Sequence, residues 1–212
     1  MDKIKFLKEN KDKLFKTYFN NIQIVEPKIV IFTAGASGAG KTEYSKSRIK
    51  KEPYLLHLDT DEIREFFRPI GYNGSNSNEY QQAASKGMDI LYKKAIDKGF
   101  SVILDSNFAS FNIAKINIEK ALKHKYIIEI VYILQNLEKC YEFAKAREKV
   151  TNRVVPKDVI KKSFINSFDT VLKIKEIFKN EVNLVLIDRI NKRTIEDIEA
   201  KEFFEIVSKE IL

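Results

Sequence analysis

The sequence predicts an α/β fold in which a parallel sheet of about five strands is flanked by helices. Short apolar runs alternate with longer segments of helical spacing, and the first run ends in a glycine-rich turn that leads directly into a helix. Consecutive strands that are joined by helices lie parallel in one sheet. The expected strands are Ile29–Phe32, Tyr54–Leu58, Val102–Leu104, Ile127–Leu134 and Leu184–Ile187.

Helices are expected between these strands and at both ends of the chain. Residues 1–20 are rich in lysine and carry apolar side chains at helical spacing, so residues 1–25 are predicted to hold an N-terminal amphipathic helix ahead of a single domain over 26–212. The polar loop Gly71–Asn78 is long enough to face a substrate. Gly99 stands where a left-handed C-cap should end a helix. The other expected helices are Glu43–Lys51, Glu79–Lys98, Asn112–Lys123, Asn136–Lys149, Lys157–Lys179 and Thr194–Ile211.

The composition is typical of a compact cytosolic protein. Cys140 is the single cysteine, which excludes an internal disulfide, and no apolar run approaches the length of a membrane span or of a signal-peptide core. We therefore expect a cytoplasmic location without membrane association. The formal net charge of +8 suits an anionic partner, either nucleotide phosphates or nucleic acid, but lysines spread along the whole chain also serve solubility alone.

The turn after the first strand is a Gly-x4-Gly-Lys-Thr motif, the phosphate-binding P-loop. Its glycines let successive backbone N–H groups point at phosphate oxygens, Lys41 adds positive charge at the β- and γ-phosphates, and the Thr42 hydroxyl reaches Mg²⁺. A glycine-rich turn that binds nothing would not require Lys-Thr at its end. The motif predicts a P-loop NTPase-type fold that binds ATP, or another nucleoside triphosphate, together with Mg²⁺. The predicted nucleotide-binding residues are Gly35, Ala36, Ser37, Gly38, Ala39, Gly40, Lys41 and Thr42.

Two carboxylates and an arginine follow the second strand, in the segment that runs from Asp59 to Arg64. Ligands of open α/β sheets bind at the carboxyl ends of the strands. Asp61 therefore suits a general base for an acceptor hydroxyl, and Arg64 suits binding of the acceptor or of a phosphate. In the alternative interpretation, Asp61 is only the N-cap of the next helix. No Asn-Lys-x-Asp segment, which is typical of GTPases, follows a later strand.

Further carboxylates lie close to the third strand. Asp105 ends that strand and is expected beside Thr42 on the Mg²⁺ side, either directly or through water. Alternatively, Asp105 caps the turn that follows. Asp89 lies beside the apolar stripe of the helix Glu79–Lys98, and taken alone it reads as a solvated helix charge.

Arg147 and Arg153 flank a connection between two helices, and Pro156 opens the second of these helices. Two arginines in such a connection form a lid, over about residues 147–156, that can close over the γ-phosphate and stabilise the charge during transfer. An ordinary solvated loop would carry such charges too.

These motifs, in this order over about residues 22–190, resemble the zeta-toxin family of small kinases, and through it the phosphotransferases that include phage-type polynucleotide 5′-kinase. The resemblance implies that the P-loop binds ATP, that Asp61 is the catalytic base, and that Arg147 and Arg153 are the lid arginines. Counting back from the Gly-aromatic pair before the third strand puts Asp89 at the family's acidic substrate-binding position.

The chain also departs from the family pattern near the third strand. Zeta toxins end this strand in Glu-Gly-Thr followed by an arginine, whereas this chain has Asp105, Ser106 and Asn107, with Ala109 in place of the arginine. The stretch between the lid arginines is shorter as well. Characterised zeta toxins phosphorylate the 3′-hydroxyl of the sugar in UDP-N-acetylglucosamine, so the resemblance implies a nucleotide-sugar acceptor whose contacts are altered here. It also implies a small antitoxin protein as a partner.

Taken together, the sequence predicts a kinase that transfers the γ-phosphate of ATP to a hydroxyl of a small acceptor. The open alternatives are a polynucleotide or nucleoside kinase, because similar Asp-x-x-Arg and Asp-x-Asn segments occur there, and a nucleotide-dependent switch without catalysis. The predicted site residues are Asp61, Lys41, Arg147 and Arg153 for catalysis, Arg64, Asp89, Asp105 and Asn107 for the substrate, and Thr42 and Asp105 for the metal.

Overall fold

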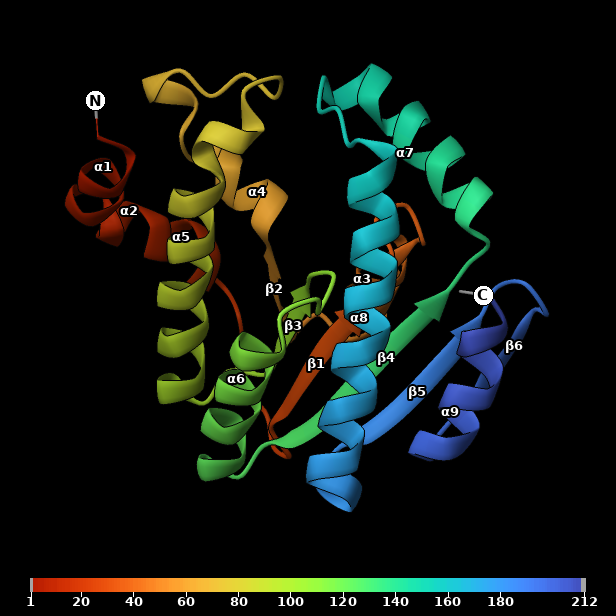
Figure 1. Cartoon of the computed structure of the whole chain (residues 1–212). Coiled ribbons are helices and arrows are strands. Elements are labelled where there is room, and N and C mark those ends of the chain that lie inside the picture. The colour runs from red at the N-terminus through yellow and green to blue at the C-terminus, as the bar shows by residue number, and fades with distance from the viewer. Residues whose placement is uncertain (1, 211–212) are drawn as a thin grey trace.

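A computed structural model describes residues 2–210, and within this range the sheet has six strands in the order β2-β3-β1-β4-β5-β6 (Figure 1). The first five strands are parallel, as the sequence predicts, and all five expected strands are present. The strands are β1 (Ile29–Ala34), β2 (Leu56–Asp59), β3 (Val102–Asp105), β4 (Ile127–Leu134), β5 (Asn183–Asp188) and β6 (Arg193–Ile195). The α/β fold class of the P-loop NTPase type is therefore confirmed.

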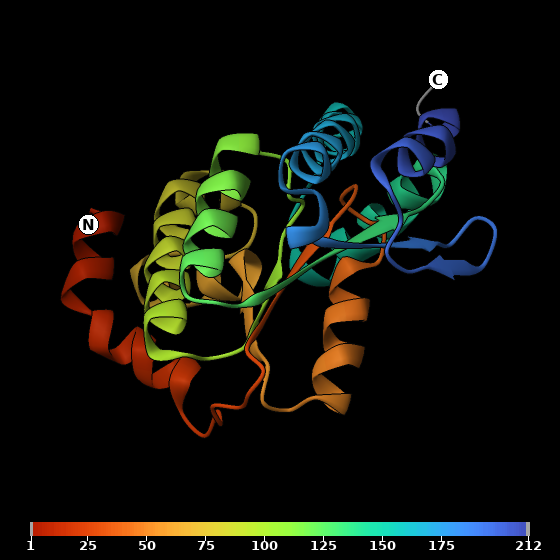
Figure 2. The ribbon, with the colours of Figure 1, turned by 90° about the horizontal axis from the view of Figure 1, so that it is seen from below.

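Helices cover both faces of the sheet. Viewed from below, α3 lies on one face, while α6, α8 and α9 lie on the other (Figure 2). At the β2 edge, α5 packs against β2, and α1 and α4 pack against α5. The helices are α1 (Lys3–Glu9), α2 (Lys11–Phe19), α3 (Lys41–Lys51), α4 (Thr60–Glu65), α5 (Ser77–Lys98), α6 (Phe111–Lys123), α7 (Leu137–Thr151), α8 (Lys157–Phe178) and α9 (Ala200–Val207).

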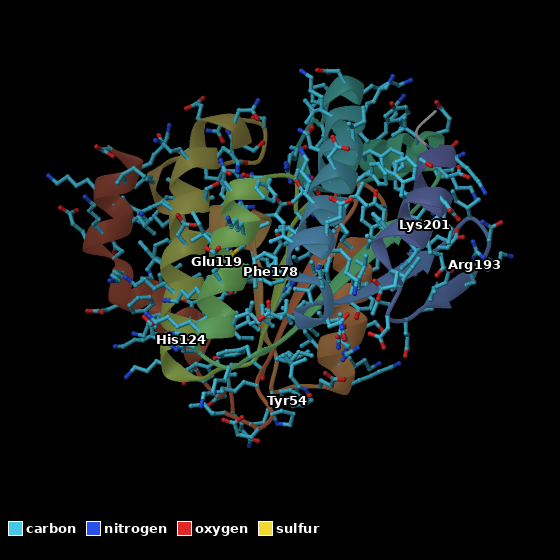
Figure 3. All side chains as sticks on the ribbon, turned by 60° about the horizontal axis from the view of Figure 1, so that its bottom comes forward. Tyr54, Glu119, His124, Phe178, Arg193 and Lys201 are labelled. Carbon is cyan, nitrogen blue, oxygen red and sulfur yellow. The ribbon has the colours of Figure 1, made fainter. Side chains whose placement is uncertain are left out.

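The sixth strand corrects the prediction of a helix from Thr194. Asp188, at the end of β5, is fully buried and accepts hydrogen bonds from the backbone N–H groups of Ile190 and Asn191 and from Arg193 Nε. These contacts turn the chain back, so that β6 pairs antiparallel with β5. Arg193 lies at the margin of the molecule on the same side of the view as Lys201 of α9 (Figure 3). The helix begins only at Ala200, and Ile211, its expected end, lies outside the described residues.

The N-terminal segment forms two helices instead of the one predicted over residues 1–20. The helical geometry is interrupted at Asn10, which has φ −108° and ψ 20° and whose side-chain amide donates to the carbonyl of Phe6 at 2.9 Å. A side chain that hydrogen-bonds its own backbone competes with helix continuation in this way. Leu7 of α1 and Leu14 of α2 are both fully buried, so both helices contribute to the hydrophobic core.

The polar loop before α5 lies against the end of α7. A side chain at Gly74 would place its Cβ 2.3 Å from the carbonyl oxygen of Thr151, so the loop and the predicted lid are in close backbone contact. Gly99 has φ 85° and ends α5, which confirms the predicted left-handed cap. No helix among residues 2–210 combines the length and the apolar character that a membrane crossing needs.

The sheet brings the candidate residues to one edge. In Figure 1, α4, α7 and the start of α8 lie at the top, beyond the carboxyl ends of the strands. In the register of β2 and β3, Asp59 is the direct neighbour of Asp105. The P-loop leaves β1 at the same edge, because β1 pairs in parallel with β3. Residues that are far apart in the sequence thus meet at one end of the sheet.

Candidate active site

The P-loop turns on glycines that no other residue could replace without strain. Gly35, Gly38 and Gly40 have φ of 125°, 86° and 97°. A Cβ on Gly35 would lie 2.5 Å from the carbonyl oxygen of Ile133, and one on Gly38 would lie 2.3 Å from the carbonyl oxygen of Cys140. The loop therefore packs directly on the backbone at the end of β4 and the start of α7, and it delivers Lys41 to the first turn of α3.

Lys41 is buried across the loop. Its Nζ donates to the carbonyls of Gly35 at 3.0 Å and Ala36 at 2.6 Å. Burial lowers the pKa of Lys41 to about 8, although the nearby charge of Asp105 works in the opposite direction. The Lys41 ammonium group is thus held by two carbonyls of the P-loop. A buried cation is better stabilised by an anion, which a bound phosphate would supply.

Two serines of α8 accept hydrogen bonds from the P-loop backbone. The N–H of Gly35 donates to Ser167 Oγ at 2.7 Å, and the N–H of Ser37 donates to Ser163 Oγ at 3.0 Å. Ser37 Oγ in turn accepts from Asn107 Nδ2 at 3.2 Å. These bonds connect the loop to α8 and to the segment after β3, so the shape of the loop depends on both.

A cavity of about 1150 Å³ opens from the P-loop toward α5 and α6. Gly35 and Ala36 do not line it, and their carbonyls accept hydrogen bonds from Lys41. The other predicted site residues all line it: Ser37, Gly38, Ala39, Gly40, Lys41, Thr42, Asp61, Arg64, Asp89, Asp105, Asn107, Arg147 and Arg153. The volume is slightly above the usual range of about 300–1000 Å³ for small-molecule sites, which suits two ligands side by side.

Asp59, and not Asp61, caps α4. Asp59 Oδ1 accepts a hydrogen bond from the N–H of Asp61 at 2.8 Å. The alternative in which Asp61 serves only as the N-cap is therefore wrong. Asp61 lies in the first turn of the helix with its carboxylate facing the cavity.

Three guanidinium groups surround the Asp61 carboxylate. Arg147 Nη2 donates to Asp61 Oδ2 at 2.9 Å, and the Nη1 atoms of Arg64 and Arg153 also bind this carboxylate. Arg64 is 2% exposed and uses its Nη2 to bind Gln81 of α5. The two predicted lid arginines thus lie over Asp61, so the α7–α8 connection covers the site in this conformation.

Asp59 and Asp105 form a buried acidic pair beside Thr42. Burial and the neighbouring Asp105 and Asp61 raise the pKa of Asp59 to about 7. Burial would also raise the pKa of Asp105, but the neighbouring His57 and Thr42 and the charge of Lys41 lower it. Asp105 Oδ1 accepts from Thr33 Oγ1 at 3.3 Å, while Oδ2 is buried without a hydrogen-bond partner. Two carboxylates and a hydroxyl with an unsatisfied oxygen between them fit a divalent cation such as Mg²⁺.

Asp89 stands apart from this network. It is exposed on α5 and lines the acceptor side of the cavity. Partial desolvation raises the pKa of the Asp89 carboxyl, and the charge of nearby Lys86 opposes this shift. Its position is compatible with a contact to a bound acceptor, and its predicted role stays a prediction.

Sequence reasoning missed several residues of the site. His57 lies two residues before Asp59, and strand alternation was a signal that could have placed both on one face. Gln81 and Arg189 had no such signal, because only the packing of α5 and of the turn after β5 brings them to the cavity. Arg189 Nη2 donates to the carbonyl of Gly40 at 3.4 Å, so its guanidinium lies over the end of the P-loop.

Solved structures share this fold. A chain of the PezAT chromosomal toxin-antitoxin system of Streptococcus pneumoniae is 17% identical with a TM-score of 0.74, and the match covers 100% of this chain and 96% of that chain. The AvrRxo1-ORF1:-ORF2 structure with ATP matches at 14% identity and a TM-score of 0.71, covering 99% of this chain and 72% of that one. The Pnkp1/Rnl/Hen1 RNA repair complex matches at 17% identity and a TM-score of 0.58, over 85% and 51% of the two chains.

At these identities the structural matches show a common fold. No curated protein matches the sequence. The family model described as zeta toxin matches residues 11–200, which include the P-loop, the Asp61 segment and the lid arginines. The match extends over most of the sequence, and the chain therefore belongs to the zeta toxin family.

Proposed function

We propose that this P-loop kinase transfers the γ-phosphate of ATP, or of another nucleoside triphosphate, to a hydroxyl of a small acceptor, with a nucleotide sugar such as UDP-N-acetylglucosamine as the first candidate. The observation that supports this most is the contact of Asp61 with Arg147 and Arg153 in the cavity that the P-loop opens into. A base for the acceptor and two cations for the transferred group are thus within reach of one another.

The P-loop side of the cavity suits the nucleotide. Backbone N–H groups of the loop and Lys41 would bind its phosphates, and Arg189 would add a positive charge over Gly40. Thr42 and Asp105, joined by Asp59, would hold Mg²⁺. When bound, the cation neutralises negative charge on the phosphate oxygens.

Phosphoryl transfer then requires the arginines to leave Asp61. Asp61 takes the proton of the acceptor hydroxyl, and it can do so only when its oxygens are no longer occupied by guanidinium groups. The negative charge of the γ-phosphate offers Arg147 and Arg153 a competing partner across the same cavity. The positions of these residues suit a site in which nucleotide binding prepares the base.

The α5 and α6 side of the cavity suits the acceptor. Gln81, Ser85, Asp89, Asn107 and Asn117 line it and offer hydrogen bonds to hydroxyl and amide groups. The PezAT and AvrRxo1-ORF1:-ORF2 structures are of paired proteins, and by analogy we propose a toxin that is neutralised by a small antitoxin. A cytoplasmic location, where ATP is available, accompanies this proposal.

A nucleic-acid end is the second candidate for the acceptor. The net charge of +8 and the fold shared with a chain of the Pnkp1 RNA repair complex favour it. A kinase acting on oligonucleotides should bind them with an affinity that falls steeply with salt. Labelling of oligonucleotide 5′ ends, without labelling of metabolites, would replace the first candidate.

The test is a mass-spectrometric screen of a metabolite extract incubated with the protein and Mg·ATP. We expect one new phosphorylated species, and we expect Asp61→Asn to reduce its formation at least 100-fold while ATP still binds. Asp97→Asn, at an exposed ion pair with Lys120, controls for the loss of a carboxylate. Transfer at the normal rate in Asp61→Asn would reject Asp61 as the base.

A further inference from the structure

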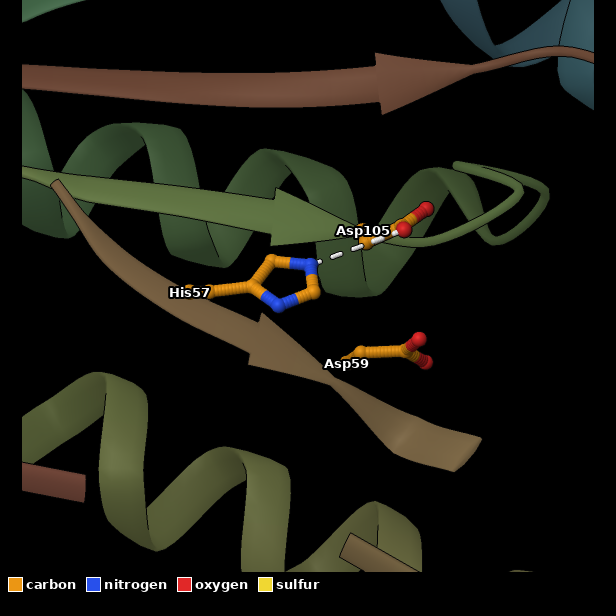
Figure 4. A group of neighbouring side chains, drawn as sticks. All are labelled: His57, Asp59 and Asp105. Atoms are coloured by element: carbon orange, nitrogen blue, oxygen red, sulfur yellow. Dashed lines mark ion pairs between the residues drawn. The ribbon is translucent and has the colours of Figure 1, made fainter. Parts of the chain in front are cut away.

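His57, Asp59 and Asp105 converge on one face of the sheet beside the P-loop (Figure 4). His57 and Asp59 are two residues apart on β2, so both side chains point to the same face. Asp105 is the direct neighbour of Asp59 on β3. One donor atom from each of the three residues can be chosen so that all three lie within 4.8 Å of one another.

Two of these donors are buried without hydrogen-bond partners. The Asp105 side chain is 4% exposed, and its Oδ2 is unsatisfied. His57 Nε2 is also buried and unsatisfied, and it lies 3.6 Å from that oxygen, beyond good hydrogen-bond distance. A buried polar atom without a partner is costly, and here two such atoms face each other. An ion bound between them would satisfy both.

The other nitrogen of the imidazole has a carboxylate partner. Glu62 Oε2 lies 3.3 Å from His57 Nδ1. Histidines that bind metals typically donate their second ring N–H to a carboxylate, which fixes the ring and leaves the other nitrogen free for the ion. The arrangement is the same here: Glu62 contacts His57 Nδ1, and His57 Nε2 faces Asp105.

We propose that His57, Asp59 and Asp105 bind a divalent transition-metal ion such as Zn²⁺ or Mn²⁺, with Glu62 orienting the imidazole. One nitrogen and two carboxylates suit these ions, whereas Mg²⁺ prefers oxygen ligands throughout. Bonds of about 2.0–2.2 Å to the ion put neighbouring ligands about 3–3.5 Å apart, so the three donors would close in by up to about 1.5 Å when the ion binds. Because all three ligands are protein side chains, the ion binds without nucleotide, and it would compete with Mg²⁺ for Asp59 and Asp105.

The competing interpretation is an ion-paired imidazolium. Burial lowers the pKa of His57, but the neighbouring carboxylates of Asp105 and Glu62 outweigh it and raise the pKa to about 9. A protonated His57 would balance the two carboxylates by charge alone, and no metal would bind. The two interpretations make opposite predictions for metal affinity.

The experiment uses the full chain, stripped of metals with a chelator, without nucleotide or acceptor. Calorimetric titration with Zn²⁺ should show one saturable site, and Co²⁺ should develop the visible absorption that nitrogen and oxygen ligation produces. His57→Gln should weaken Zn²⁺ binding at least 100-fold, and Glu62→Gln about 10-fold. Asp59→Asn, which keeps a good N-cap for α4, should also weaken it strongly.

The chain offers a matched control, because it contains two histidines. His124 caps the end of α6, near the amino ends of the strands, and lies 3.8 Å from Asp97 (Figure 3). His124→Gln should leave the affinity unchanged. In that variant, any nitrogen coupling in pulsed electron paramagnetic resonance of bound Mn²⁺ at the imidazole frequency must come from His57.

Absence of saturable Zn²⁺ binding, or equal affinity in His57→Gln with an unchanged circular dichroism spectrum, would overturn the proposal and favour the imidazolium. Because no ATP or acceptor is present, this outcome leaves the proposed kinase activity intact. Conversely, metal binding in a protein that transfers no phosphate would support the site and count against the activity.

Discussion

Asp59 and Asp61 lie at the start of α4, two residues apart, and they hold different partners. Asp59 accepts the backbone N–H of Asp61, as an N-cap does, and thereby fixes the first turn of the helix. Asp61 does not cap the helix, and its carboxylate instead binds three arginines. Two carboxylates of one helical turn therefore differ in role: Asp59 caps the helix beside Asp105, whereas Asp61 is available to a substrate.

His57 should make the stability of the protein depend on pH. Its pKa is about 9 in the folded protein, against an ordinary value of 6.5. Its contribution is therefore fully present below pH 6.5 and is lost as the pH rises through 9. In metal-free buffer, His57→Gln should lower the free energy of unfolding by about 2–3 kcal/mol at pH 6, and the loss should shrink toward pH 9.5.

This prediction is checked by denaturant unfolding at several pH values, with His124→Gln as the control for removal of an imidazole. A difference between the wild type and His57→Gln that stays constant from pH 6 to 9.5 would mean that His57 does not change its charge in this range. Asp105 and Glu62 are the charged neighbours that raise the pKa of His57.

At the scale of elements, the P-loop and the lid are held in place by contacts with their neighbours. The loop rests on the backbone of β4 and α7 and accepts no Cβ at Gly38. The lid, residues 147–156, leaves α7 at Asn152, which has φ 57°, and it contacts Asp61 through Arg147 and Arg153. The position of the P-loop therefore depends on close backbone contacts, and the position of the lid depends on its ion pairs with Asp61.

Gly38→Ala should destabilise the protein more than another substitution at a positive-φ glycine. Gly38 has φ 86° and its added Cβ would lie 2.3 Å from the Cys140 carbonyl oxygen, whereas Gly71 has φ 101° and its Cβ would lie 3.4 Å from Tyr80 Oη. Gly71→Ala should cost about 1–2 kcal/mol for the conformation alone. Gly38→Ala should cost about 1–3 kcal/mol more for the collision. Equal losses in chemical denaturation would contradict this packing.

The lid should loosen when Asp61 loses its charge. Asp61→Asn keeps the size of the side chain but weakens its bonds to Arg147 and Arg153. We expect faster amide hydrogen exchange over residues 147–156 in this variant, while exchange in α9 stays the same and serves as the internal control. Unchanged exchange in the lid would show that packing, and not these ion pairs, holds it down.

At the scale of the whole molecule, the sequence predicted what depends on local pattern and missed what depends on register. Nearly all residues of β1 and β3 and most of those of β4 are buried, so these strands read as continuous apolar runs. The P-loop, Asp61 and the lid arginines were found because each is part of a motif. The strand β6 was missed because the contacts of Asp188 create it, and the break at Asn10 was missed because the apolar spacing continues through it.

The same limit applies to the site. His57 joins Asp105 only through the pairing of β2 with β3, and no spacing in the sequence encodes that pairing. Arg189 reaches Gly40 only because β5 and β1 both flank β4. Residues that only tertiary contacts bring to the site are therefore best tested by measurements on the whole folded protein, such as its Tm.

Arg189 should couple nucleotide binding to global stability. A ligand that binds only the folded state stabilises it by RT ln(1 + [L]/Kd), so a weaker Kd reduces the rise in Tm at a fixed concentration. The guanidinium of Arg189 lies over the P-loop at Gly40 and lines the cavity, so it can contribute charge to bound phosphates. Arg189→Ala should weaken Mg·ATP binding about 10-fold and reduce its stabilising effect by about 1.4 kcal/mol.

The measurement is the Tm of each protein with and without saturating Mg·ATP. Arg68→Ala is the control, because this exposed arginine pairs with Glu65 and is absent from the cavity lining. Arg189→Ala should keep the Tm of the nucleotide-free wild type, since its bond to Gly40 is long and exposed. A full nucleotide-induced shift in Arg189→Ala would place this arginine outside the nucleotide site and leave phosphate binding to the P-loop and the lid.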